Sequence, residues 1–148
     1  MPPDTSDIRH SSKRTKAAAL VELVSRMRGV VPWLDVQAIE TLFLSALTIA
    51  ELRFGIAAMP SGKRQTILHD RLEGEVLPHF SERILPFNLV TSQFYSELMA
   101  RTRVSGKAIG KADGYIAATA LANGLAVATR DTSPFEAAGL NVINPWSQ

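Results

Sequence analysis

Cysteine is absent from the 148 residues of the sequence. Its absence excludes disulfide bonds, zinc sites built on thiolates and cysteine nucleophiles, and it favours a reducing compartment, so we expect a cytoplasmic protein. Long hydrophobic runs are also missing, because no apolar stretch approaches the ~18 residues that a membrane-spanning helix requires. The apolar stretch 17–24 behind the basic N-terminus is short and contains Glu22, which argues against a secretory signal.

Three familiar catalytic signatures are missing as well. The histidines, His10, His69 and His79, do not have the spacing of metal ligands. Neither Gly62-Lys63 nor Gly106-Lys107 lies in a phosphate-binding P-loop, and no G-x-S-x-G nucleophile motif occurs. Carboxylates are therefore the side chains that remain for catalysis or metal binding.

The composition indicates one globular domain behind a basic leader. The chain is 46% hydrophobic and 20% charged, which is enough apolar material for a core. Residues 1–16 are rich in Pro, Ser, Thr, Lys and Arg and lack hydrophobic periodicity, so we expect a disordered leader there and a single domain over 17–148. The net charge of +2 and the pI of about 9.2 mildly favour an anionic partner.

Helical and strand-like segments alternate along this domain. Helices are expected over 17–27, 30–40, 48–58, 64–77, 91–102 and 113–122, with a last short helix from Ser133. Strands are expected over 42–45, 84–87, 125–129 and 140–143. The alternation predicts an α/β fold, with a central parallel sheet of about four to five strands flanked by helices on both sides.

Two aspartates in the stretch 111–131 are expected to meet at one edge of the sheet. Apolar residues recur at helical spacing after Asp113, so its side chain leaves from the helix face that packs against the sheet. Asp131 lies just past the carboxyl end of the apolar strand 125–129. Because ligands of open α/β sheets bind at this edge, both aspartates are candidate functional residues.

Four segments carry motifs that are distinctive when they occur together. They are FLSALTIAELRFGI (43–56), GKAIGKADGYIAATA (106–120), LAVATRD (125–131) and INPW (143–146). In these segments the chain resembles the PIN-domain ribonuclease toxins of the VapC type, closest to the FitB branch, and the resemblance covers about residue 30 to the C-terminus. It implies a PIN-like domain that cleaves RNA with Mg2+ or Mn2+ and has an antitoxin as its partner.

The resemblance also assigns a site residue by residue. Glu51 in T-I-A-E-L matches the glutamate of the family, Asp113 in A-D-G-Y-I its central aspartate, and Asp131 in A-T-R-D its last aspartate. These three acids are the expected catalytic residues and, with Asp4 as a candidate fourth, the expected metal ligands. Oxygen ligands suit hard Mg2+ and Mn2+ ions, and a cation relieves the repulsion within a cluster of carboxylates.

The start of the chain departs from the family pattern, in which a hydrophobic strand ends in Asp-Thr-Asn. Asp4-Thr5-Ser6 is a partial match, but Met1-Pro2-Pro3 cannot form the buried strand before it, because proline has no N–H for the ladder. A second alignment puts Leu20 at the aspartate position and leaves Glu22 as the nearby acid. A shifted Asp4, a substitute Glu22 and a damaged site remain open.

Each acid also has a purely structural interpretation. Glu51 has the spacing of a capping box with Thr48. Asp113 suits an N-cap or a first-turn position near the helix dipole, and Asp131 suits a solvated turn. Gly114 and the alanines after it suggest close packing of the helix on the sheet. Four cations flank the acids and either contact phosphates or stay solvated: Arg53, Lys107, Lys111 and Arg130.

Three functions are compatible with these observations. The first is a metal-dependent endoribonuclease that is the toxin of a type II toxin-antitoxin pair. The second is a catalytically impaired PIN module that only binds its antitoxin and takes part in operator DNA binding through it, and the third is a DNA nuclease. Trp146 and the apolar helices, together with the resemblance, favour a homodimer, and no membrane contact is expected.

Overall fold

The computed structural model describes residues 19–21 and 41–144. Within these residues the strands form one five-stranded sheet in the order β3-β2-β1-β4-β5, and every neighbouring pair is parallel. The strands are β1 (Ala19–Val21), β2 (Leu42–Ser45), β3 (Ile84–Leu85), β4 (Ala126–Ala128) and β5 (Val142–Ile143). The predicted α/β class with a parallel sheet is confirmed, whereas the expected leader 1–16 lies outside the described residues.

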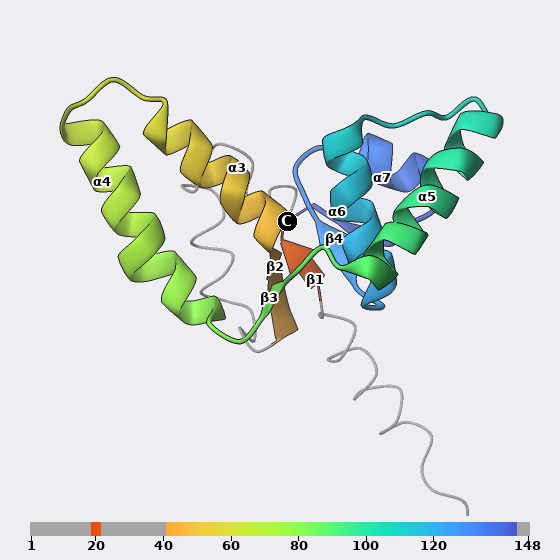
Figure 1. Ribbon diagram of the computed structural model, residues 1–148, viewed down its shortest axis with the longest axis horizontal. Coiled ribbons are helices and arrows are strands. Elements are labelled where there is room, and N and C mark those ends of the chain that lie inside the picture. The colour runs from red at the N-terminus through yellow and green to blue at the C-terminus, as the bar shows by residue number, and fades with distance from the viewer. Residues whose placement is uncertain (1–18, 22–40, 145–148) are drawn as a thin grey trace, which may run out of the picture.

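The helices lie on both faces of the sheet, with α3 and α4 on one side and α5, α6 and α7 on the other (Figure 1). They are α3 (Ala46–Ala57), α4 (Lys63–Arg71), α5 (Leu89–Val104), α6 (Lys111–Ala122) and α7 (Ser133–Ala137). No described helix is long and apolar enough to cross a membrane. The helix expected over 30–40 lies outside the described residues.

The segment after α4 stays helical beyond the point where the sequence predicts a stop. A π-helix, η2 (Leu72–Val76), and a 3-10 helix, η3 (Leu77–Phe80), continue it. The end of the helix expected over 64–77 is therefore wrong, because helical turns continue to Phe80. Pro78 lies at the start of η3, where a missing N–H removes no intrahelical hydrogen bond.

The helix expected over 17–27 is wrong where the structure describes it, because residues 19–21 form the central strand β1. Leu20 pairs with Phe43 of β2 and with Val127 of β4, and its side chain is fully buried. A short apolar run fits a buried parallel strand as well as a helix, and periodicity cannot separate the two. Pairing with strands far along the chain decides the outcome.

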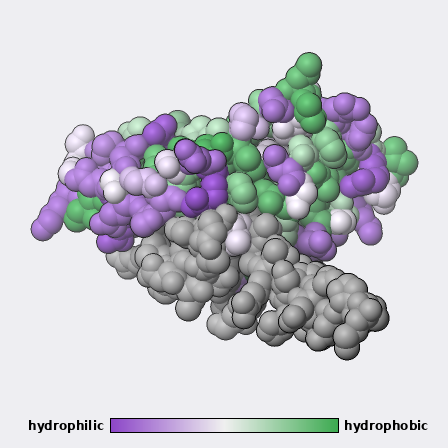
Figure 2. All heavy atoms as spheres, turned by 90° about the horizontal axis from the view of Figure 1, so that it is seen from below, coloured by the Kyte–Doolittle hydropathy of each residue, from purple (hydrophilic) through white to green (hydrophobic). Residues whose placement is uncertain are grey.

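Alternate strand residues face two separate hydrophobic clusters. Leu42 and Leu44 pack on the side of α3 and η3, where Phe80 is fully buried. Leu20 and Val127 pack on the other side with apolar residues of α5, α6 and α7. No residue of α4 is buried, and the end of the molecule that α4 forms is mostly hydrophilic (Figure 2). The sheet is thus the middle layer of three.

Gly114 lets α6 approach α5 closely. It is buried, and a Cβ at its position would lie 2.6 Å from Met99 Sδ and 3.1 Å from Tyr95 Cε2. The expected contact of Gly114 with the sheet is therefore a contact with a helix instead. Ala117 and Ala120, one and two turns later, do pack in the cluster that contains strand residues.

We expect the free energy of unfolding of Gly114→Ala to be at least about 1 kcal/mol lower than that of Gly55→Ala. Gly55 lies in α3 with open space around its Cβ position, so alanine there should stabilise the helix by up to ~1 kcal/mol. At position 114 the same gain is opposed by overpacking, which costs about 1–3 kcal/mol. Urea unfolding of both variants measures the difference. Equal stabilisation by the two substitutions would contradict the close contact.

Candidate active site

Asp113 lies in the first turn of α6, whose N-cap is Gly110. The N-cap interpretation of Asp113 is therefore wrong, and the first-turn interpretation is confirmed. A carboxylate in a first turn is favoured by the positive end of the helix dipole. The side chain is half-buried, so part of this carboxylate is removed from solvent.

Asp131 lies just past β4, as predicted. Its backbone N–H donates to Thr129 Oγ1 at 3.2 Å, and Thr129 is fully buried. The backbone N–H of Thr129 donates to the carbonyl of Ile143 in β5 at 2.9 Å. Thr129 thus fixes the turn that carries Asp131. Sequence reasoning missed Thr129, although a hydroxyl two residues before a turn acid is a signal for this hydrogen bond.

Asp113 and Asp131 lie close enough for their charges to interact. Burial, and then the charge of Asp131, raise the pKa of Asp113. Within the described part of the chain, no ion pair involves either aspartate. The structure therefore brings together two of the predicted site residues, and their repulsion is not relieved by a described basic side chain.

Glu51 comes from the opposite layer, on α3, and is exposed. The N-cap of α3 is Ser45, whose hydroxyl accepts a hydrogen bond from the Leu47 N–H at 3.1 Å. The capping box expected between Thr48 and Glu51 is therefore wrong, because Thr48 lies inside the helix. Glu51 and Lys111, the first residue of α6, line one cavity of about 450 Å3.

A compact metal cluster is not complete in the described residues: no three His, Asp or Glu side chains within 19–21 and 41–144 could jointly hold an ion. The structure does not group Glu51 with the aspartate pair. Asp4 and Glu22 lie outside the described residues, and Glu22 directly follows β1 in the sequence. Because Val21 pairs with Ala128, the carboxyl end of β1 lies beside the strand end that leads to Asp131.

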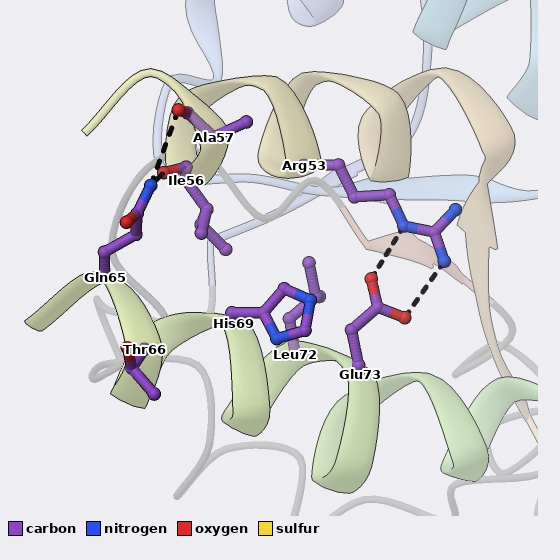
Figure 3. Close-up of a pocket in the computed structure, with 8 residues that line it drawn as sticks. All are labelled: Arg53, Ile56, Ala57, Gln65, Thr66, His69, Leu72 and Glu73. Carbon is purple, nitrogen blue, oxygen red and sulfur yellow. Dashed lines mark hydrogen bonds and ion pairs between the residues drawn. The ribbon is translucent and has the colours of Figure 1, made fainter. Parts of the chain in front are cut away.

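Arg53 is bound to Glu73 by two hydrogen bonds of 2.8 and 3.0 Å (Figure 3). Gln65 also joins α4 to α3, because its amide donates to the carbonyls of Ile56 and Met59 at 3.0 and 3.2 Å. A cavity of about 430 Å3 lies between the two helices. Figure 3 shows the guanidinium directed at Glu73, so this ion pair competes with the expected contact of Arg53 with phosphate.

Three other cations near the acids keep their charge exposed. Lys111 opens α6, Arg130 directly precedes Asp131, and Lys107 lies in the loop before α6. Among the described residues none of the three takes part in an ion pair. They are therefore the cations of the predicted set that remain available to an anionic ligand.

Comparison of the sequence with known proteins identifies the family. The sequence matches the PIN domain over residues 9–140. The chain belongs to the PIN-domain family. It is 68% identical over 119 residues to VapC ribonuclease Y4jK of Sinorhizobium fredii, which covers 80% of this chain and 85% of the relative. It is 50% identical over 117 residues to toxin FitB of Neisseria gonorrhoeae, with 79% and 84% covered.

Solved structures agree with the fold of this PIN domain. FitAcB from Neisseria gonorrhoeae superposes with a TM-score of 0.76 at 46% identity, over 84% of this chain and 90% of that one. FitAB bound to an IR36 DNA fragment gives a TM-score of 0.78 at 42% identity, over 86% and 95%. The predicted resemblance to the VapC type, with FitB as a relative, is confirmed.

We expect Asp113→Asn to raise the thermal stability of the metal-free PIN domain at neutral pH. A folded-state pKa above the unfolded value means that the folded protein binds this proton more tightly than the unfolded chain does. The stability from this group is therefore fully present below the unfolded pKa of about 3.9 and is lost as the pH rises through the folded pKa. Asparagine is uncharged and avoids that loss.

Thermal melts in EDTA across this pH range measure the effect. The gain of Asp113→Asn over the wild type should be present near neutral pH and should shrink toward zero below the unfolded pKa. Glu82→Gln, which neutralises an exposed carboxylate, is the control and should give no comparable gain. A lower melting temperature of Asp113→Asn near neutral pH would contradict the raised pKa of Asp113.

Proposed function

We propose that this PIN domain is a metal-dependent endoribonuclease and the toxin of a type II toxin-antitoxin pair, acting in the cytoplasm. The observation that carries the proposal is the pairing of Asp113 with Asp131 at the carboxyl edge of the parallel sheet. Support also comes from the 68% identity to a protein named as a VapC ribonuclease. An α/β sheet binds its ligands at this edge.

The chemistry of the donor set fits Mg2+ or Mn2+. Asp113 and Asp131 present hard oxygen ligands whose mutual repulsion a divalent cation would relieve. Glu51 is proposed as the third ligand, and Asp4 as a fourth, with Glu22 as its alternative. An ion held there supplies a water of lowered pKa and stabilises charge on the phosphodiester.

Residues around the acids would position Asp131 and hold the RNA. Thr129 holds the turn of Asp131 through the backbone, so that this carboxylate keeps its place beside Asp113. Lys111 and Arg130 are exposed next to the acids and would hold the phosphates of the RNA, mostly through charge. Lys107, further along the loop, would add to the same field.

A catalytically impaired module is the second candidate, and one observation favours it. Leu20, which one alignment places at the position of the family's first aspartate, is fully buried in β1. If no other acid takes its place, the metal site lacks one ligand. Such a chain would still fold and bind an antitoxin, but it would not cleave RNA.

We expect Mn2+ to raise the melting temperature of the wild type, because an ion that binds only the folded state at about 100 times its Kd adds ~2.7 kcal/mol. Asp113→Asn and Asp131→Asn should lose this shift and lower RNA cleavage by about 100-fold or more, as loss of a transition-state contact does. Glu51→Gln should weaken both. Calorimetry, melts and a single-stranded RNA cleavage assay measure these effects.

The controls separate the two candidates. Arg53→Gln should retain cleavage, since Arg53 is bound to Glu73 and not to the acids. A folded wild type that neither binds Mn2+ nor cleaves RNA would establish the impaired module. Full activity of both aspartate variants would refute the assigned site.

Assembly is the other part of the proposal. The solved relatives are named as FitAB and FitAcB complexes, one of them bound to DNA, so we propose an antitoxin as partner and operator DNA contact only through it. The chain alone is proposed to form a homodimer. Light scattering at micromolar concentration should give twice the chain mass, and a larger particle with the antitoxin. A monomer in both samples would contradict the assembly.

A further inference from the structure

The cavity beside Glu51 has two aromatic walls. It lies between α3 and α6, has a volume of about 450 Å3, and is lined on one side by Glu51 and Phe54 and on the other by Lys111 and Tyr115. Phe54 follows Glu51 by three residues on α3, so the two side chains share one helix face. Phe54 is 75% exposed, so most of its surface is open to a ligand. We call this cavity the Phe54–Tyr115 groove.

Tyr115 is held in place by other aromatic rings. It stacks on Tyr95 of α5 with ring centres 4.7 Å apart and an angle of 23° between the planes. Phe87 meets the Tyr115 ring edge-on at 5.3 Å. These contacts fix one wall of the groove before any ligand binds, which lowers the entropy lost when a flat ring packs there.

We propose that the Phe54–Tyr115 groove binds an unpaired nucleobase of the RNA, next to the phosphodiester that the proposed nuclease site would cleave. The inference rests on the proposed nuclease function and adds to it a subsite for an unpaired base. Stacking on aromatic rings accepts every base, because each base has a π face. A base inside a duplex is stacked on its neighbours and would have to leave the helix to enter.

Charge and continuity favour a nucleotide over an apolar protein segment. Lys111 lies at the rim and at the start of α6, where its ammonium group and the helix dipole both attract a phosphate. Glu51 is both a wall of the groove and a proposed metal ligand, so the groove adjoins the proposed reaction site on that side. A base in the groove therefore has its phosphate on the side of the acids.

The test measures binding and cleavage separately. In an Asp113→Asn background, fluorescence anisotropy gives the Kd for a labelled single-stranded oligoribonucleotide and for the same strand in a duplex. Phe54→Ala should weaken single-strand binding by about 5- to 150-fold, the range for one lost stacked base, and should leave the weak duplex binding unchanged. Phe54→Leu should fail to restore the affinity, whereas Phe54→Trp should retain it.

A matched control uses an exposed apolar residue outside the groove. Leu89, at the start of α5, is 87% exposed, and Leu89→Ala should leave RNA affinity unchanged. Phe54→Ala should also leave the folded mass and antitoxin binding unchanged in light scattering. Loss of the dimer or of the antitoxin with unchanged RNA affinity would overturn the proposal and make the groove a protein interface.

The two proposals fail in different ways. Cleavage by the wild type together with RNA binding that does not depend on Phe54 overturns the base site and leaves the nuclease. Phe54-dependent binding without cleavage overturns the nuclease activity and leaves the base site. Full affinity of Phe54→Leu overturns stacking, because leucine offers apolar surface but no ring.

Discussion

The parallel pairing of β1, β2 and β4 is the constraint on which the site depends. Leu20 is paired with Phe43 and with Val127, so the carboxyl ends of three strands lie at one edge. Asp131 follows one of these strands, and the helix that carries Glu51 follows another. A shift of one residue in the register of β1 would turn its side chains toward the opposite hydrophobic cluster. Burial of both faces of the sheet forbids such a shift.

Helix α6 contacts α5 and the sheet, and it lines the cavity that it shares with α3. Its buried side uses Gly114 to approach α5 and the alanines of the next turns to approach the sheet. Its first turn carries Asp113, while Lys111 and Tyr115 face the cavity shared with α3. Because each turn of α6 meets a different neighbour, its buried positions tolerate little increase in side-chain size. This explains why small residues dominate the helix.

Sequence reasoning succeeds where a signal is local. The apolar strand 42–45, the first-turn position of Asp113 and the strand end before Asp131 follow from short patterns, and the structure has all three. It fails where distant partners decide. The residues of β1 read as a helix, and the Arg53–Glu73 ion pair joins residues 20 apart that no motif connects.

The start of helix α7 is a second case in which a sequence motif does not predict the observed structure. Ser133 and Glu136 have capping-box spacing, yet the N-cap of α7 is Thr132 and no side chain makes the capping bond. Pro134 fixes the first turn instead, because proline suits that position and needs no partner for an N–H. The capping-box spacing of Ser133 and Glu136 therefore does not decide where α7 begins, because Pro134 already restricts the backbone to helical angles.

The electrostatics of the site follow from the three-layer architecture. Glu51 and Asp113 lie on helices that cover opposite faces of the sheet, and Asp131 lies in the turn after β4. Each helix packs on a neighbouring helix, α3 on α4 through the hydrogen bonds of Gln65 and α6 on α5 at Gly114, so the backbone that carries Asp113 is held in place. The folded domain therefore keeps Asp113 half-buried near Asp131, and burial together with the charge of Asp131 raises the pKa of Asp113. In the proposed metal site, the stability without an ion and the affinity for an ion therefore depend on the same two carboxylates.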